Sequence, residues 1–375
     1  MAYWVLPAFL LSIGAGPALL GIIEGVAESV ASFGKLFSGY LADRFELRKP
    51  LVTGGYAVSN IAKPLLALAT RWWQVLGVRF ADRGAKGLRG TARDVMLAES
   101  TRAGAMGGAF GLLQAMDSAG AILGPLVALL LLARVGFRTL FWMAGIPGLA
   151  AVLVIWLGAR ETHRTAEKES KRGSLEHKRV SFAEFLHGGA ALPRGFYILV
   201  LAVTLFSLGN SSDMFLVLRA HTAGLTARQA PLFGLVFNVV YTAAAWPAGK
   251  LSDRTSKRSL AALGYLIFAA VYFCFAAAPS RAALWAAMAG YGIYYALTDP
   301  VLRALVAESV APESRGRAFG IYFFSTSLAT LAASLLAGQL WKHLGPGVPF
   351  VVSAALALVA AVMLVVRPAA DNSPA

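Results

Sequence analysis

The sequence has little charge and almost no cysteine. Charged residues make up 14% of its 375 positions and apolar residues 58%, and the mean hydropathy is +0.65. Soluble globular domains carry about 25% charged residues, so this composition argues against a soluble enzyme. The single cysteine, Cys274, excludes an intramolecular disulfide and a metal site built of several thiolates. A helical protein that crosses a membrane many times fits the composition.

Motifs of nucleotide and metal chemistry are also missing. No G-x-x-x-x-G-K-[ST] loop occurs, which argues against ATP-driven pumping. Three of the five histidines, His163, His177 and His187, lie in a hydrophilic segment without a partner at ligand spacing, and the other two lie near loops. We therefore expect no enzyme, no catalytic residue, no cofactor and no bound metal.

Long apolar runs predict membrane-spanning helices. Eleven runs approach or exceed the roughly 20 residues that a hydrocarbon layer of about 30 Å requires. They are 18–41, 51–70, 72–95, 105–132, 138–158, 195–218, 229–251, 259–278, 282–306, 316–341 and 346–366. A shorter run, Tyr3–Ile13, covers about half of the layer, like the second half of a truncated twelfth helix. We expect either that an upstream start codon supplies the missing half or that the first helix is short.

One long hydrophilic segment, 159–192, divides the chain. It predicts an N-terminal bundle of six helices (1–158), a linker, and a C-terminal bundle of six helices (193–375). The 34 basic against 19 acidic residues give a net charge of +15. Lys and Arg concentrate in the linker and in the loops after even-numbered helices, so the positive-inside rule places the linker and both chain ends in the cytoplasm. The excess charge is thus a topology signal, and we expect no nucleic-acid partner.

A sequence repeat relates the two halves. GYLADRFELRK at Gly39–Lys49 returns as GKLSDRTSKR at Gly249–Arg258, an offset of 210 residues. Ala98-Glu99-Ser100 returns as Ala307-Glu308-Ser309 at an offset of 209. Because the offset keeps the helix parity, the halves are predicted to be parallel repeats.

These residues resemble the major facilitator superfamily, whose loop between helices 2 and 3 carries G-x-L-x-D-R-x-G-R-K/R, often repeated between helices 8 and 9. Glu46, Leu47 and Ser256 depart from the pattern. The residues that fit its first copy are Gly39, Leu41, Asp43, Arg44, Arg48 and Lys49. The resemblance covers the whole chain and implies an all-α membrane protein of two six-helix bundles, which carries a solute by alternating access. A tract in helix 4, DRGAKGLR, is similar to the D-R-x-G-K-G-x-R of a narrower group of bacterial permeases, so we expect the bacterial inner membrane.

The repeated loop predicts a gate. An Asp at a helix end can accept hydrogen bonds from the start of a neighbouring helix, while the adjacent Arg meets a carboxylate on another helix. The predicted gating residues are Asp43, Arg44, Glu99, Asp253, Arg254 and Glu308. The alternative is that the basic residues of the loop only anchor the topology.

Ionisable and polar residues inside the spans are the best candidates for the solute pathway, because a charge at membrane depth is costly. The superfamily architecture implies that helices 1, 4, 7 and 10 surround a central cavity. The pathway candidates are Asp82, Lys86, Arg89, Arg93, Asn210, Asp213, Asn238, Asp299 and Arg303. The alternative for helix 4 is an ion-pair ladder that joins helices 2, 4 and 5. The tyrosines of helix 10, Tyr291, Tyr294 and Tyr295, favour packing over solute contact.

Proton coupling requires a carboxylate without a neighbouring base. Glu24 and Glu28 repel each other across one helical turn, which favours one proton on the pair. Asp117 is the next candidate. The alternative is that the two glutamates neutralise the basic residues of helix 4.

Together these features predict a secondary transporter of a small solute, driven by protons. Gly120 to Pro125 resembles part of the antiporter motif of drug exporters and slightly favours export. The alternatives are a proton-coupled importer and a non-transporting membrane receptor or scaffold. Beyond solute, protons and lipid we expect no partner, and we expect a monomer.

Overall fold

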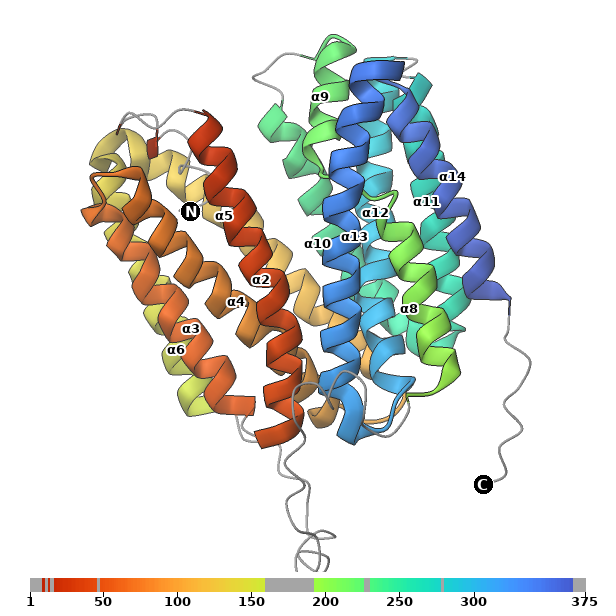
Figure 1. Cartoon of the computed structure of the whole chain (residues 1–375), viewed down its shortest axis with the longest axis horizontal. Coiled ribbons are helices and arrows are strands. Elements are labelled where there is room, and N and C mark those ends of the chain that lie inside the picture. The colour runs from red at the N-terminus through yellow and green to blue at the C-terminus, as the bar shows by residue number, and fades with distance from the viewer. Residues whose placement is uncertain are drawn as a thin grey trace, which may run out of the picture. The chain divides into compact units, whose positions relative to one another are not determined.

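The computed structural model describes residues 9–10, 13, 17–45, 48–158, 192–225, 230–277 and 280–366 (Figure 1). Every regular element among them is a helix, which confirms the predicted all-α fold. The helices are α2 (Pro17–Phe45), α3 (Arg48–Leu65), α4 (Trp72–Ser100), α5 (Met106–Met143), α6 (Gly145–Gly158), α8 (Arg194–Ser207), α9 (Met214–Thr222), α10 (Ala230–Arg254), α11 (Lys257–Ala277), α12 (Arg281–Glu308), α13 (Arg315–Leu344) and α14 (Val348–Val365), with single turns η1 (Leu66–Leu68) and η3 (Pro312–Ser314).

The predicted spans fall on these helices. By length and composition, the described residues contain five helices that could cross a membrane: Arg138–Gly158, Leu232–Arg254, Lys257–Ala277, Pro312–Leu344 and Val348–Val365. The predicted boundary between 132 and 138 corresponds to Gly136, whose φ of +71° interrupts the long helix α5. Only a residue without a Cβ adopts this left-handed conformation readily, so Gly136 allows the chain to change direction here. Most of the predicted first segment and the linker lie outside the described residues.

The predicted helix 195–218 is wrong in one respect, because the structure divides it. Helix α8 ends at Ser207, α9 begins at Met214, and residues 208–213 are not helical (Figure 1). The intervening residues read LGNSSD, in which Gly, Asn and Ser are weak helix formers. Asn, Ser and Asp also compete for backbone hydrogen bonds through their side chains. Hydropathy alone cannot detect this break because apolar residues continue on both sides.

The chain forms two compact units that are not continuous in sequence. One contains Met1–Ser100, Gly124–Leu192 and Ala311–Phe324; the other contains Thr101–Leu123, Pro193–Val310 and Ser325–Ala375. Each unit therefore includes the start of a helix from the opposite half of the sequence, α13 in the first and α5 in the second. The domain division at the linker 159–192 remains a prediction.

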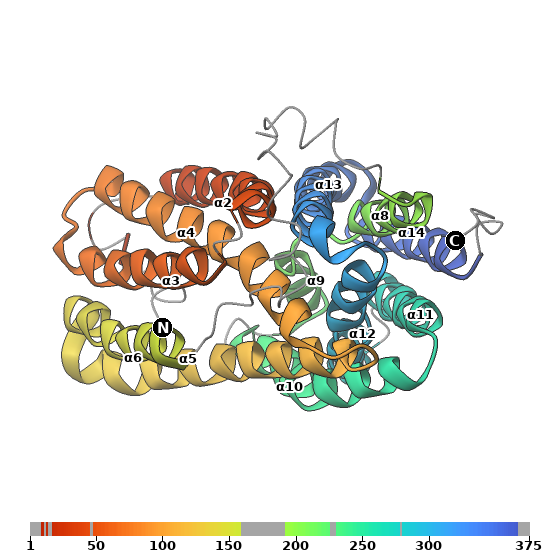
Figure 2. The same ribbon diagram turned by 90° about the horizontal axis from the view of Figure 1, so that it is seen from below.

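Helix α4 forms the centre of the first unit, where it packs against both α2 and α3 (Figure 2). Its contact with α2 depends on glycine: a Cβ at Gly87 would lie 2.5 Å from the carbonyl oxygen of Ala31 and 3.1 Å from the Cα of Gly34. This unit also contains an apolar core, in which the rings of Phe9 and Phe141 pack edge to face with their centroids 5.1 Å apart. The close approach of α2 and α4 places the charged residues of α4 inside the unit.

We predict that Gly87→Ala destabilises the protein and that Gly90→Ala does not. A methyl group at Gly87 would overlap the backbone of α2, an overpacking cost of about 1–3 kcal/mol. A Cβ at Gly90 meets no described atom within 4 Å, so alanine there should stabilise α4 by up to about 1 kcal/mol. Thermal unfolding of the purified variants measures the difference. Equal melting temperatures for both variants would contradict this account of the α2–α4 contact.

Candidate functional site

The two copies of the repeated loop make the same hydrogen bonds. Asp43, near the end of α2, accepts from the backbone amides of Gly316 and Arg317 at 2.9 and 2.6 Å. Asp253, near the end of α10, accepts from the amides of Gly107 and Gly108, both at 2.7 Å. Each carboxylate thus satisfies amides that the first turn of a helix leaves unpaired, and its charge lies at the positive end of the helix dipole. These are the hydrogen bonds that the sequence predicts, whereas their role in gating remains a prediction.

The basic partners of Glu99 and Glu308 differ from the expected ones. Glu99 pairs with Arg48 at 2.8 Å, and Glu308 pairs with Lys257 at 3.1 Å. Arg48 and Lys257 are 209 residues apart, as are the two glutamates, so the ion pairs repeat as well. Arg254, an expected partner, is exposed.

The side chain of Arg44, the other expected partner, lies outside what the structure describes. Sequence alone could not distinguish Arg44 from Arg48, because both match the family pattern. An offset of 209 residues relates Arg48 to Lys257 and Glu99 to Glu308, but the loop copies align at 210, so the repeat alone did not identify this pair.

Asp82, in the middle of α4, is buried and contacts three polar side chains. Asp82 accepts a hydrogen bond from Ser59 of α3, pairs with Lys86 at 2.6 Å, and lies 3.6 Å from Arg79. Asp94, also buried, lies 3.5 Å from Arg93. Asp82 and Lys86 are therefore brought together, as their spacing predicts.

Arg89 faces α3 and Arg93 lies further along α4. The Arg89 guanidinium lies over the Tyr56 ring, 3.7 Å from its centroid, a cation–π contact. Lys86 keeps about a third of its side chain exposed. Arg89 and Lys86 are thus oriented by different partners, and the ion-pair ladder that would join helices 2, 4 and 5 remains an alternative.

A second polar cluster lies on α5, α10 and α12, within the second unit. Asp299 accepts hydrogen bonds from Gln114 and from Tyr241, the latter at 2.9 Å, and pairs with Arg303 at 3.2 Å. One turn away, Ser118 donates to the side-chain oxygen of Asn238 at 3.2 Å. Sequence reasoning identified Asp299, Arg303 and Asn238 but missed Gln114. A lone amide inside the apolar run 105–132 was the available signal.

The break between α8 and α9 carries a third cluster. The Tyr291 hydroxyl of α12 donates to Asp213 at 2.8 Å and lies 3.4 Å from the side-chain oxygen of Asn210. Asn210 donates to the Tyr294 hydroxyl at 3.5 Å. Asp213 is exposed although it lies within a predicted membrane span. The tyrosine rings pack together, as expected, but the Tyr291 hydroxyl also has a polar role.

The candidates for proton coupling are only partly described. Glu24 and Glu28 lie on α2, but their side chains are outside what the structure describes. Asp117 is exposed on α5. Their role in coupling remains a prediction.

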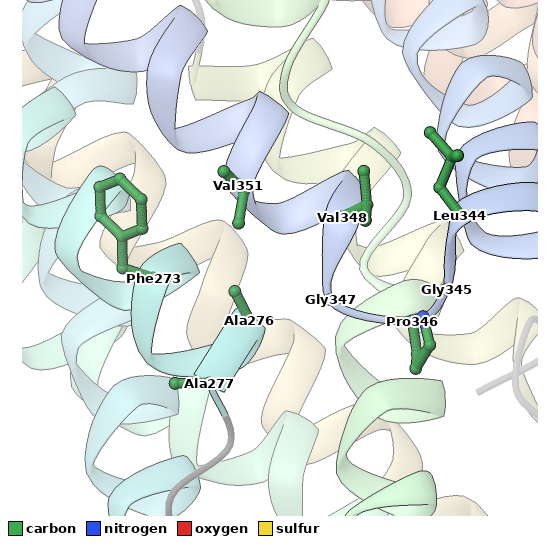
Figure 3. A pocket seen from close by; sticks show the side chains of 9 residues that line it. All are labelled: Phe273, Ala276, Ala277, Leu344, Gly345, Pro346, Gly347, Val348 and Val351. Carbon is green, nitrogen blue, oxygen red and sulfur yellow. The ribbon is translucent and has the colours of Figure 1, made fainter.

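An apolar hollow of about 570 Å³ lies between α11 and the turn from α13 to α14 (Figure 3). Its lining residues are Phe273, Ala276, Ala277, Leu344, Gly345, Pro346, Gly347, Val348 and Val351. No charged or polar side chain lines it, so it does not suit a polar solute.

We predict that Asp43 makes stability depend on pH. Asp43 lies beyond the predicted span 18–41, and burial raises the pKa of its carboxyl from 3.8 to about 7, although two backbone amides and Arg48 lower it. A raised pKa means that the folded protein holds this proton below pH 7 and that the contribution to stability is lost as the pH rises through 7. From pH 6 to 8 the loss should be about 1.4 kcal/mol.

The comparison is between wild type and Asp43→Asn, whose amide oxygen can still accept a hydrogen bond but cannot titrate. Melting temperatures at pH 6 and 8 should differ less in the variant than in wild type. The same decrease in both proteins would show that Asp43 does not titrate in this range.

Comparison with known proteins identifies the family. The sequence profile of the Major Facilitator Superfamily matches residues 1–237 and 199–375. An uncharacterized MFS-type transporter of Methanocaldococcus jannaschii is 29% identical over 368 residues, 96% of this chain and 88% of the relative. The inner membrane transport protein YajR of Escherichia coli is 25% identical over 343 residues, 87% of this chain and 70% of YajR.

A solved structure supports the same fold. The crystal structure of the human organic anion transporter MFSD10 (TETRAN) matches with a TM-score of 0.76 and 17% identity, over 95% of this chain and 87% of that one. At this identity the likeness concerns the fold alone. With the profile matching the whole length, the chain belongs to the Major Facilitator Superfamily and is a membrane transporter of small solutes, not an enzyme.

Proposed function

We propose that this chain is a proton-coupled secondary transporter of a small anionic solute, with export favoured over import. Alternating access of two six-helix bundles, 1–158 and 193–375, would move the solute. The hydrogen bonds from the starts of α13 and α5 to Asp43 and Asp253 would stabilise one closed state. The relative YajR is an inner membrane transport protein, which supports a bacterial inner membrane. The distribution of Lys and Arg favours a cytoplasmic linker and C-terminus. The export direction depends on the antiporter-like residues Gly120 to Pro125.

The observation that supports an anionic solute is the excess of positive charge in the first unit. Two residues are acidic in the predicted spans of α3 and α4, Asp82 and Asp94, and both are buried beside bases. Six are basic: Lys63, Arg79, Arg83, Lys86, Arg89 and Arg93. With α2 included, which adds Lys35, Glu24 and Glu28, the three spans hold seven bases and four acids, an excess of three positive charges. An excess of positive charge at membrane depth is costly unless an anion compensates it, which is the role we assign to the solute.

Four of these bases are accessible enough to meet a solute. Arg83, Lys86, Arg89 and Arg93 are partly exposed, whereas Arg79 is buried against Asp82. Arg89 is held over Tyr56, which orients its planar guanidinium, the group that suits a carboxylate or phosphate. The remaining pathway candidates lie in the second unit: Asn210, Asp213, Asn238, Asp299 and Arg303.

We predict that anions stabilise the purified protein and that Arg89→Gln removes most of this effect. The probes are inorganic phosphate, sulfate, lactate and succinate, with tetramethylammonium and glucose as comparisons. A ligand that binds only the folded state raises the melting temperature, and loss of one charge-assisted hydrogen bond should weaken binding by roughly 10- to 100-fold. Arg89→Lys, which keeps the charge but loses the planar fork, should be intermediate.

Arg71→Gln is the matched control, because Arg71 is exposed in the loop before α4. Any anion that protects wild type is then tested for counterflow and for pH-driven accumulation in proteoliposomes. Stabilisation by tetramethylammonium or glucose alone would contradict an anionic solute. Binding without counterflow would favour a receptor, and accumulation down an inward proton gradient would favour an importer.

A further inference from the structure

Four carboxylates of the described spans differ in their partners. Asp82 has Lys86, Asp94 has Arg93, and Asp299 has Arg303, each base lying on the same helix within four residues. A base so close compensates the negative charge of the carboxylate. Asp213 is different: among the described residues its partner is the Tyr291 hydroxyl, and no base pairs with it.

The described groups that face Asp213 from α11, α12 and α13 are neutral. Tyr291 of α12 donates to Asp213, and the rings of Tyr294 and Tyr295 of α12 and of Tyr272 of α11 pack against Tyr291. From α13, Ser334 accepts a hydrogen bond from the backbone amide of Ser212. No neighbouring charge on these elements therefore compensates the ionised form of Asp213.

Two arginines of the surrounding helices, Arg219 and Arg303, are bonded elsewhere. Arg219, on α9 itself, donates to the backbone carbonyls of Phe275 and Ala276 at 2.9 and 2.8 Å. Arg303 pairs with Asp299, and its Cα lies about 18 Å along α12 from that of Tyr291 at 1.5 Å per residue. Asp213 is thus a carboxylate at membrane depth that is exposed and lacks a basic partner among the described residues.

We propose that Asp213, held by Tyr291 at the break between α8 and α9, is a proton-binding site of this transporter. Secondary transporters often place coupling-ion sites at interrupted helices, where backbone and side chains are not committed to the helix. Protonation adds one hydrogen to the carboxylate and removes its charge, and release restores it. The ionised form is stabilised by the Tyr291 hydroxyl, and the protonated form is compatible with the aromatic surroundings.

A proton fits this site better than a metal ion does. A hard metal cation requires several oxygen ligands, often from more than one carboxylate. The described residues contain no group of three or more His, Cys, Asp or Glu side chains that could hold a metal ion. At Asp213 one carboxylate faces tyrosine hydroxyls and rings, which suits protonation.

The test is a pH titration of the purified full chain by attenuated total reflection infrared spectroscopy, which detects the carbonyl band of a protonated carboxyl group. We expect a titrating band in wild type that Asp213→Asn removes and Asp299→Asn retains. Tyr291→Phe keeps the ring but removes the hydrogen bond to the ionised carboxylate, so the midpoint should rise by about one pH unit. Tyr294→Phe is the matched control, since Tyr294 has no hydrogen bond to Asp213, and should shift the midpoint less.

Two results would overturn the proposal. The first is an unchanged set of titrating bands in Asp213→Asn. The second is a wild-type midpoint that falls when sodium chloride replaces choline chloride, because that would identify an alkali cation as the ligand. The site's role in transport rests on the proposed proton coupling, but the spectrum needs no solute. Failure of anion transport and failure of proton binding are therefore distinguishable.

Discussion

A polar group inside a membrane protein must find its partner within the protein, and this constraint organises the structure. At each helix start the first amides lack intrahelical acceptors, and lipid offers none. Asp43 and Asp253 supply two acceptors each, to the starts of α13 and α5. The glycines at these contacts follow from the same constraint. A side chain at Gly316 would overlap the Asp43 carboxylate, and one at Gly107 would overlap Ser252.

The same constraint arranges the charges inside the spans. Asp82 is buried with three donors around it, two of them from its own helix, so its charge is compensated locally. Asp299 combines one base with an amide and a hydroxyl from two other helices, so it also joins α5, α10 and α12. Buried ion pairs contribute little net stability, because desolvation offsets much of their attraction. These pairs lie within one helix, and it is the hydrogen bonds from Ser59, Gln114 and Tyr241 that link α4 to α3 and α12 to α5 and α10.

Much of this could be predicted from sequence because it depends on patterns along the chain. Apolar run length predicted most of the helices and the repeat predicted the paired loops. A helix start was the expected donor for Asp43 and Asp253, but the sequence did not identify which helix. The sequence did not predict which basic residue pairs with each glutamate. Arg44 and Arg48 match the pattern equally, and only the start of α3 at Arg48 places that guanidinium beside Glu99. Gln114 was missed because its partners, Tyr241 and Asp299, lie 127 and 185 residues away.

The break between α8 and α9 shows where local pattern and tertiary structure meet. An interrupted helix leaves amides without intrahelical acceptors, but here Asn210 still donates to the carbonyl of Phe206, and Ser212 donates to Ser334. These two amides therefore keep acceptors within the protein. Helix α8 packs along α14, whereas α9 makes only a few contacts with α10 and α11. A short helix with few contacts is easier to displace than its longer neighbour. Because Asp213 lies at the start of α9, any displacement of α9 changes the surroundings of this carboxylate, and a change in its charge acts in turn on the position of α9.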